Sequence, residues 1–306
     1  MRTDLLAELE PVVEANLNRH LNVAKEWFPH EYVPWSEGRD FTEQPWAPEQ
    51  SRLSPEVQAA LELNLVTEDN LPAYHYVVAS RFGLDGPWGQ WVNRWTAEEG
   101  RHAQVIRDYL LVTRGVDPVR LERWRMSAMS GGYDGSRSDA LEAMVYVSFQ
   151  ELATRVAHRN TGAATGDPVA ERLLARIAAD ENLHMIFYRS LVDAALQIDP
   201  SATVLAVLAK LREFGMPARE ATGFARRSLV IARAGIFSLR IHLDDVVRPL
   251  LRHWDYFALG GLTGEAQRAQ DELADLLDGI DRTASRQLEQ IEAGRERRRR
   301  LQDARA

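Results

Sequence analysis

The sequence has no cysteine among its 306 residues. This absence excludes disulfide bonds, thiolate nucleophiles and cysteine zinc sites, and it fits a reducing compartment. The chain also lacks any run of the roughly 18 to 20 apolar residues that a membrane-spanning helix needs, and acids interrupt its first residues where a signal peptide would be apolar. We therefore predict a cytoplasmic protein without a membrane span.

Basic residues are in deficit as well. Lysine and arginine number 37 against 45 acids, which gives a net charge of −8. An acidic chain is a poor electrostatic partner for nucleic acid, so we expect no nucleic-acid binding. Disorder is excluded too, because 45% of the residues are apolar and 27% are charged, the ordinary balance of a folded domain.

Strand signals are scarce, whereas helix signals recur along the chain. A capping side chain stands directly before a proline at Ser54, Asp117, Asp167 and Asp199, which is the pattern of a helix start. We predict an all-α chain that forms a single domain over residues 1–306. Its predicted parts are a bundle core at about 54–197 with long helices over 54–83, 86–114, 138–162 and 167–197, flanking helices at 1–28 and 199–301, and a loop at 127–138.

Two of these helices carry the same interruption on their apolar faces. The stripe of helix 86–114 is broken by Glu99 and His102, and the stripe of helix 167–197 is broken by Glu181 and His184. Residues three apart lie on one face of a helix, so each Glu-x-x-His pair can direct a carboxylate and an imidazole at one point. Each pair is therefore half of a candidate metal site.

The other two helices carry one inward acid each, Glu68 and Glu151, about 30 residues before the Glu of the next pair in both cases. A buried carboxylate must be protonated, paired or bound to metal, and no lysine or arginine lies near the acids on these stripes. Four carboxylates balance two divalent cations, and oxygen donors with imidazoles favour iron or manganese over calcium. The alternative is an architectural bundle whose core acids are satisfied without metal.

This ligand set has a known architectural context. One Glu from each of two helices and a Glu-x-x-His pair from each of the other two are typical of ferritin-like di-metal bundles. We therefore predict a ferritin-like four-helix bundle with additional flanking helices.

Five segments of the sequence resemble the soluble acyl-carrier-protein desaturases, the stearoyl-type enzymes of plastids and their actinobacterial relatives. These segments are TEDNLPAYH (67–75), WTAEEGRH (95–102), SFQELATRVAHRNT (148–161), AADENLH (178–184) and GLTGEAQRAQDEL (261–273). The resemblance implies an oxygen-dependent enzyme of fatty acid biosynthesis that introduces a cis double bond into a saturated fatty acyl chain.

The resemblance also implies cofactors and partners. These are two iron ions in a di-iron centre, dioxygen as co-substrate, an acyl carrier protein that presents the acyl chain, a ferredoxin-type electron donor and a second copy of the chain in a homodimer. The residues that match the family's iron ligands are Glu68, Glu99, His102, Glu151, Glu181 and His184.

Roles for further residues follow from the same resemblance. Thr154 matches a threonine near the oxygen-binding face, and Asp180 matches an acid that hydrogen-bonds a ligand histidine, here His102. Trp35 matches a tryptophan that the family associates with electron entry, with plain packing as the alternative. The candidates for the acyl channel are Val77, Ala143, Met144 and Val147, for which core packing is the alternative.

Besides a catalytically silent family member that binds acyl carriers as a scaffold, two other functions remain open at this point. The first is a di-iron oxygenase that acts on another substrate, which the shape of the pocket would decide. The second is a ferritin-like iron-binding protein without an acyl substrate, which would oxidise iron without any dependence on acyl chains.

Overall fold

The structure is a computed structural model that describes residues 4–131, 138–216, 219 and 222–303. Within these ranges it contains helices and no strands, so the predicted all-α fold is confirmed. Of the predicted loop at 127–138, residues 127–131 are helical, and 132–137 lie outside the described residues. The helices are α1 Leu5–Val23, α2 Pro55–Asp69, α3 Leu71–Phe82, α4 Gly86–Val112, α5 Pro118–Gly131, α6 Ala140–Thr165, α7 Pro168–Ile198, α8 Pro200–Glu213, α9 Phe224–Ala234, α10 Leu239–Ile241, α11 Arg248–His253 and α12 Gly264–Asp303.

The predicted helix starts are confirmed by their hydrogen bonds. Ser54 accepts from the amide of Val57 at the start of α2, and Asp167 accepts from the amide of Val169 at the start of α7. Asp117 and Asp199 also accept amide hydrogen bonds at the first turns of their helices. These caps satisfy backbone donors that have no partner inside the helix.

The prediction of one continuous helix over 54–83 is wrong. Helix α2 ends at Asp69, and α3 begins at Leu71 with Pro72 in its first turn. Proline has no amide hydrogen to donate to the carbonyl of Glu68, and the amide of Asn70 contacts that carbonyl instead. The chain therefore bends directly after one of the candidate metal ligands.

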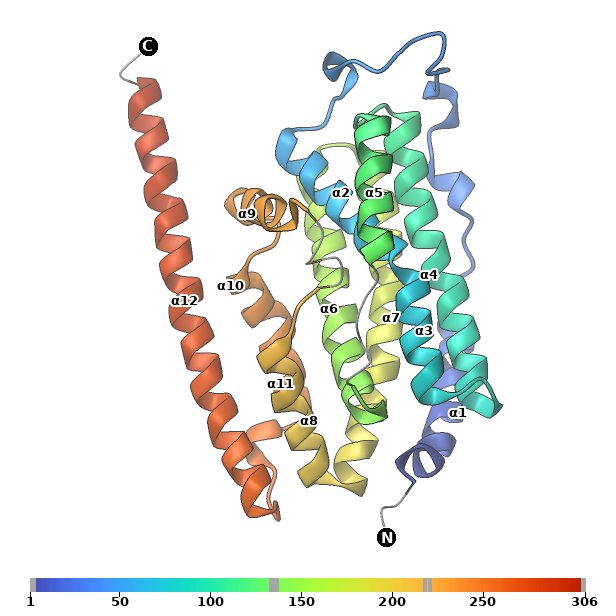
Figure 1. Cartoon of the computed structure of the whole chain (residues 1–306), viewed down its shortest axis with the longest axis vertical. Coiled ribbons are helices and arrows are strands. Elements are labelled where there is room, and N and C mark those ends of the chain that lie inside the picture. The colour runs from blue at the N-terminus through green and yellow to red at the C-terminus, as the bar shows by residue number, and fades with distance from the viewer. Residues whose placement is uncertain (1–3, 132–137, 217–218, 220–221, 304–306) are drawn as a thin grey trace.

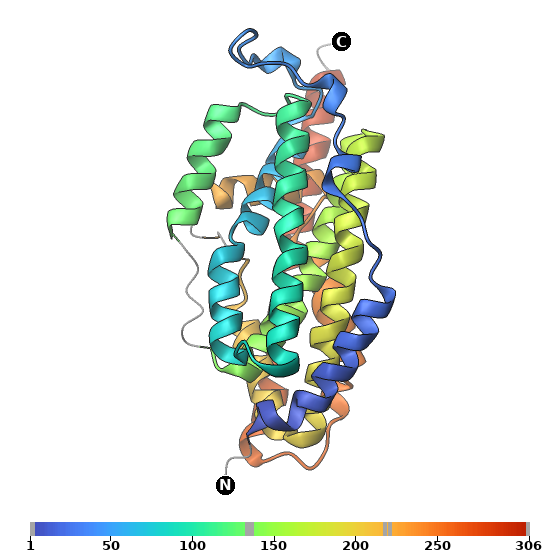
Figure 2. The ribbon, with the colours of Figure 1, turned by 90° about the vertical axis from the view of Figure 1, so that its right-hand side faces the viewer.

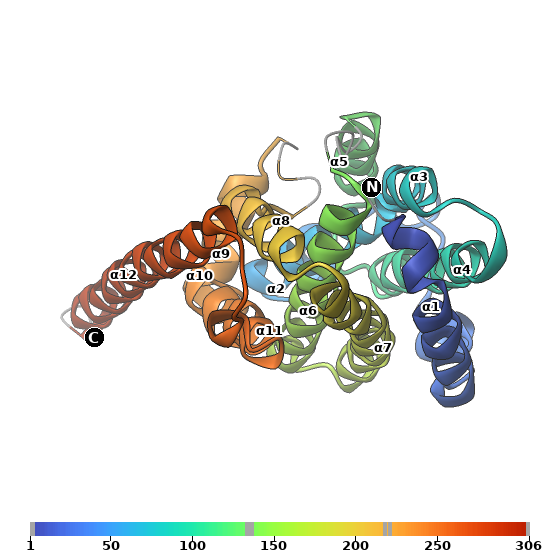
Figure 3. The ribbon, with the colours of Figure 1, turned by 90° about the horizontal axis from the view of Figure 1, so that it is seen from below.

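The helices pack around the central pair α6 and α7. Helices α2, α3 and α4 pack on one side of this pair, and α1 packs against α4 and α7. Helix α8 packs on the other side, and the long helix α12 packs against α8 and α10. Seen along the bundle, α12 and α1 therefore lie at opposite edges, with α6 and α7 between them (Figures 1 and 3).

The segment between α1 and α2 follows the outside of the bundle. After α1 it runs along α7 and forms the short 3₁₀ helix η1, Pro29–Tyr32 (Figure 2). This helix packs against both α4 and α7. The predicted first helix, at 1–28, is thus shorter than expected, and its last residues are an extended strap over the two helices that carry the Glu-x-x-His pairs.

A layer of polar side chains separates the two largest apolar clusters of the core. On α4, residues 88–95 belong to a larger apolar cluster and residues 105–110 to a smaller one. On α7, residues 170–177 belong to the smaller cluster and residues 185–196 to the larger. The six candidate ligands lie between the two clusters. Across the described ranges, no helix combines the length and the apolar character that a bilayer crossing needs.

Candidate metal centre and apolar cavity

The six candidate ligands converge in the middle of the bundle, although they come from four helices. Helix α2 supplies one glutamate and α6 another, and α4 and α7 each supply a Glu-x-x-His pair. Each side chain is at most 5% exposed. The six residues are Glu68, Glu99, His102, Glu151, Glu181 and His184.

These residues form two overlapping sets of four, each with donor atoms within 4.8 Å of one another. The first set contains Glu68 and His102, the second contains Glu151 and His184, and both contain Glu99 and Glu181. Each set has one imidazole, one carboxylate of its own and two shared carboxylates. With two carboxylates in common, the six residues would hold two metal ions, which matches the predicted balance of four acids and two divalent cations.

The ring nitrogens that face the carboxylates are the Nδ1 atoms. His102 Nδ1 lies 3.6 Å from Glu68 Oε2, 3.7 Å from Glu99 Oε2 and 3.4 Å from Glu181 Oε1. His184 Nδ1 lies 2.7 Å from Glu99 Oε1 and 3.5 Å from Glu151 Oε2. All six side chains therefore direct at least one donor atom toward the same small volume.

The donor atoms in this volume fit a metal because they lack other partners. Both Nδ1 atoms are buried without a well-formed hydrogen bond, as are Glu99 Oε1, Glu151 Oε2 and Glu181 Oε1. Buried polar atoms of a folded protein normally have partners. Five such atoms pointing at each other are explained if metal ions are the missing partners.

The pKa values of these groups reflect the same crowding. Burial opposes a charged imidazole, yet the surrounding carboxylates raise the pKa of His102 and of His184 well above the usual value. Burial, together with the like charges of Glu181 and Glu99, raises the pKa of Glu151. Without metal, bound protons must supply the positive charge that this layer needs.

The opposite ring nitrogen of His102 contacts Asp180, as the sequence predicts. Asp180 Oδ2 lies 3.4 Å from His102 Nε2 and accepts a hydrogen bond of 2.7 Å from Trp27 Nε1. Trp35, which the resemblance matched to a tryptophan associated with electron entry, is 52% exposed and donates to the carbonyl of His30. Trp27 on the strap is the indole that contacts Asp180, and the role of Trp35 in electron entry stays a prediction.

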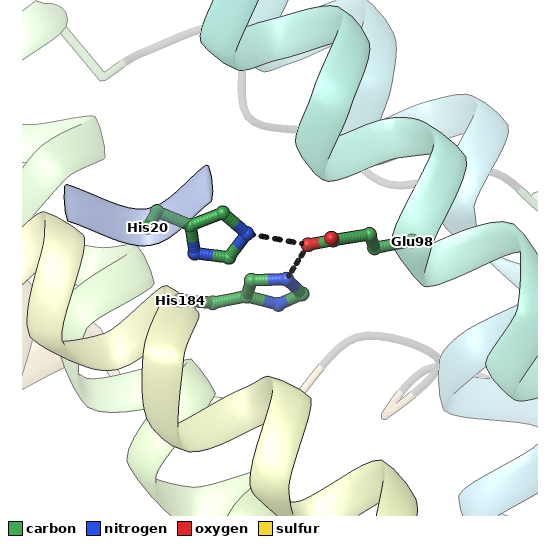
Figure 4. Close-up of side chains that lie close together, drawn as sticks. All are labelled: His20, Glu98 and His184. Carbon is green, nitrogen blue, oxygen red and sulfur yellow. Dashed lines mark hydrogen bonds and ion pairs between the residues drawn. The ribbon is translucent and has the colours of Figure 1, made fainter. Parts of the chain in front are cut away.

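Glu98 contacts His184 in the same way, and the sequence analysis missed it. Glu98 Oε2 lies 2.9 Å from His184 Nε2 and 2.9 Å from His20 Nε2, so one carboxylate oxygen joins two imidazoles (Figure 4). Burial opposes the charged form of Glu98, but hydrogen bonds from the two histidines hold its pKa well below the usual range. Glu98 also forms an ion pair with Arg94 at 2.5 Å.

Three of the four central carboxylates have further hydrogen-bond partners. Trp95 Nε1 donates to Glu151 Oε1 at 3.0 Å, and Thr154 Oγ1 lies 2.9 Å from Glu181 Oε2. His158, to which the sequence analysis gave no role, contacts Glu68 Oε1 at 2.8 Å through Nε2. These contacts hold the carboxylates in place.

An apolar cavity opens directly beside the cluster. It encloses about 590 Å³ including the space at its mouth, and Glu68, Thr154 and His158 lie in its wall. The rest of its wall comes from α2, α6, α9 and the segment around Phe237 and is mostly apolar. The predicted channel residues Ala143, Met144 and Val147 instead belong to the larger apolar cluster, and neither they nor the half-buried Val77 line this cavity.

Comparisons with known proteins agree with this combination of fold and site. The chain is 49% identical over 288 residues to the "putative acyl-[acyl-carrier-protein] desaturase DesA1" of Mycobacterium tuberculosis, a match that covers 90% of this chain and 85% of that protein. It is 35% identical over 241 residues to stearoyl-[acyl-carrier-protein] 9-desaturase 6 of Arabidopsis thaliana, covering 73% of this chain and 61% of that protein.

A solved structure supports the same relationship. The X-ray structure of DesA2 from M. tuberculosis H37Rv superposes with a TM-score of 0.71 at 33% identity, over 82% of this chain and 95% of that one. The sequence model of the family described as fatty acid desaturase matches residues 1–303. This chain therefore belongs to the fatty acid desaturase family.

Proposed function

We propose that this protein is a di-iron desaturase that introduces a cis double bond into a saturated acyl chain carried by an acyl carrier protein. The observation that carries the proposal is the shared wall between the apolar cavity and the cluster of candidate ligands. Glu68 belongs to both, and Thr154 in the cavity wall contacts Glu181 of the cluster. A hydrocarbon chain in the cavity would thus lie against the metal centre, whereas a site that only stores iron has no need of an apolar pocket there.

One iron would be held by Glu68 and His102, the other by Glu151 and His184, with Glu99 and Glu181 shared between them. A di-iron centre supplies, with dioxygen and two electrons, an oxidant strong enough to remove hydrogen from unactivated methylene groups. The overall reaction converts –CH2–CH2–, dioxygen, two protons and two electrons into –CH=CH– and two water molecules. An external ferredoxin-type protein would provide the electrons.

The residues of the chain bind and orient the substrate. The apolar wall excludes water and restricts the acyl chain to a few conformations, which fixes the methylene pair that faces the cluster. The Thr154 hydroxyl lies between Glu181 Oε2 and the cavity, so it can donate to either side. His158 holds Glu68 at the cavity wall.

The carrier protein would dock over α9. This helix forms one side of the cavity through Phe224, Ser228 and Ile231, and it contains three arginines and no acid. Arg226 and Arg233 are exposed. A basic helix in the cavity wall complements an acidic carrier, and such complementarity steers association.

Mass spectrometry of the carrier tests this proposal. Acyl carrier protein loaded with a saturated chain is incubated with the iron-loaded protein, reduced ferredoxin and dioxygen, and loss of two hydrogens from the acyl group is expected. An unchanged acyl mass while ferrous iron is oxidised would favour the iron-binding alternative, and an added oxygen atom would favour the oxygenase. The homodimer and the cytoplasmic location remain predictions, which light scattering and cell fractionation can test.

A further inference from the structure

The two Glu-x-x-His pairs are each preceded by an acid, and each of these acids serves the histidine of the other helix. Asp180 on α7 contacts His102 on α4, and Glu98 on α4 contacts His184 on α7. The arrangement is therefore crosswise. In both cases the acid contacts Nε2, so Nδ1 faces the central carboxylates. A second partner on the far ring nitrogen commonly fixes the tautomer and orientation of a metal-binding histidine.

Both acids receive a further contact from the N-terminal part of the chain. Asp180 accepts from Trp27 on the strap, and Glu98 contacts His20 near the end of α1. Their charges are also compensated, since Arg101 lies 3.4 Å from Asp180 and 3.9 Å from Glu98. The two acids are thus satisfied without metal, in contrast to the four central glutamates.

His20 is placed to act on Glu98 and on little else. It is 1% exposed, and its Nδ1 atom has no hydrogen-bond partner, so we assign the ring proton to Nε2, which faces Glu98. The ring stacks near His184 at a centroid distance of 5.8 Å and meets Trp91 edge-on at 5.1 Å. Burying a polar ring at the end of α1 is costly unless its hydrogen bond is used.

We propose that His20 is a positioning residue for the metal centre, acting on His184 through Glu98. Its Nε2–H donates to the same oxygen, Glu98 Oε2, that accepts from His184 Nε2. Arg94, 41% exposed, draws the other oxygen of Glu98 toward the surface. His20 opposes that pull from inside the protein and keeps the shared oxygen in line with His184. The proposal rests on the metal centre proposed above.

Substitutions at position 20 separate the hydrogen bond from the packing of the ring. His20→Phe keeps the ring and its contact with Trp91 but removes the donor. His20→Gln retains an amide donor near the position of Nε2, whereas His20→Asn has the same chemistry but is too short to reach Glu98. His253→Phe is the matched control, because His253 pairs with Asp193 at the partly exposed surface.

Each variant is loaded anaerobically with ferrous iron, and the metal content, the rate of iron release to a chelator and the Mössbauer spectrum are measured. In His20→Phe we expect one of the two irons to be released about 10- to 100-fold faster, with an altered signal for that iron alone. His20→Gln should restore slow release, and His20→Asn should not. If His20→Phe fails to fold, the Gln and Asn variants decide between the outcomes.

Two results would overturn the proposal. One is slow, unchanged release of both irons from His20→Phe or His20→Asn. The other is equally fast iron release from the His20→Gln and His20→Asn variants, which would show that the ring's packing and not its hydrogen bond retains the iron. A wild-type chain that binds no iron would instead remove the metal centre itself, and this role of His20 with it. The wild-type measurement therefore separates failure of the proposed function from failure of the positioning role.

Discussion

Glu151→Gln should lower metal binding and raise the stability of the metal-free protein at the same time. Glu151 is fully buried on α6, with Oε2 facing the cluster and Oε1 accepting from Trp95. Glutamine has nearly the same shape, and its amide oxygen can keep the Trp95 hydrogen bond. The substitution thus removes one negative charge and one metal donor while leaving the packing in place.

The size of both effects follows from the charge balance. Four carboxylates offset the charge of two divalent ions, so the three carboxylates of the variant leave one positive charge uncompensated in a buried layer. The set of candidate ligands that contains His184 also falls from four residues to three. We expect metal content to fall from two ions per chain to about one. In the metal-free protein, burial and the charges of Glu99 and Glu181 raise the pKa of Glu151, so this carboxyl costs free energy whether it stays ionised or takes up a proton. Glutamine removes that cost, which should raise the free energy of unfolding by about 1–3 kcal/mol.

Metal analysis after anaerobic ferrous loading and urea unfolding in a chelator at constant pH measure the two quantities. Glu142→Gln is the control, because Glu142 lies on the same helix but pairs with Lys210 away from the cluster. It should bind two ions per chain without a gain in stability. Two tightly bound ions in Glu151→Gln, or a metal-free variant less stable than the wild type, would refute the reasoning.

Three further predictions concern the cavity, the carrier and an isolated histidine. Replacing both Arg226 and Arg233 by glutamate should lower the activity on acyl carrier protein at low salt and make that activity less dependent on salt. Activity on the same acyl group bound to coenzyme A, which we expect to be poor in the wild type, should hardly change. Equal losses of activity with both substrates would contradict docking at α9. Ile231→Trp should fill part of the cavity and shift activity toward shorter acyl chains, while the iron content stays at the wild-type level. Product analysis with acyl chains of different lengths measures the shift. An unchanged preference for chain length would exclude this cavity as the acyl site. Burial lowers the pKa of His242 from 6.5 to about 4. Between pH 6.5 and pH 4 this histidine is therefore protonated in the unfolded chain but neutral in the folded one, so the wild type should lose stability as the pH falls through this range. Over this pH range the free energy of unfolding, measured in urea titrations, should fall by about 1–3 kcal/mol less in His242→Gln than in the wild type. Equal falls in the two proteins would show that this histidine is already charged in the folded state.

The sequence predicted those features that depend on residues within a single helix. The helix starts depend on a capping side chain and the next few amides, and the inward acids depend on the spacing within a single stripe. The break between α2 and α3 was missed because the apolar pattern continues through it. Pro72 is the local signal that could have shown the break, since a proline four residues after Glu68 cannot complete the helical hydrogen bond.

Contacts between helices were much harder to predict. Asp180 was assigned to His102 by resemblance, but Glu98 was not assigned to His184, although the segments AEEGRH and ADENLH place an acid before each Glu-x-x-His pair. Applying the duplication to that position would have found Glu98. His20 had no comparable signal, since its role depends on how α1 packs across α4 and α7. Trp27 had no such signal either, because no periodic pattern aligns the strap with the bundle.

The polar layer between the two apolar clusters has a consequence for cooperativity. In the metal-free chain, the larger and smaller clusters are joined mainly by continuous helices that cross this layer of buried carboxylates and imidazoles. The two halves can then open as separate units, with amides on either side of Glu99 exchanging with solvent at different free energies. Metal ions would link all four helices across that layer and merge the halves into a single cooperative unit. Loading would thereby complete the folding of the bundle as well as equip it for chemistry.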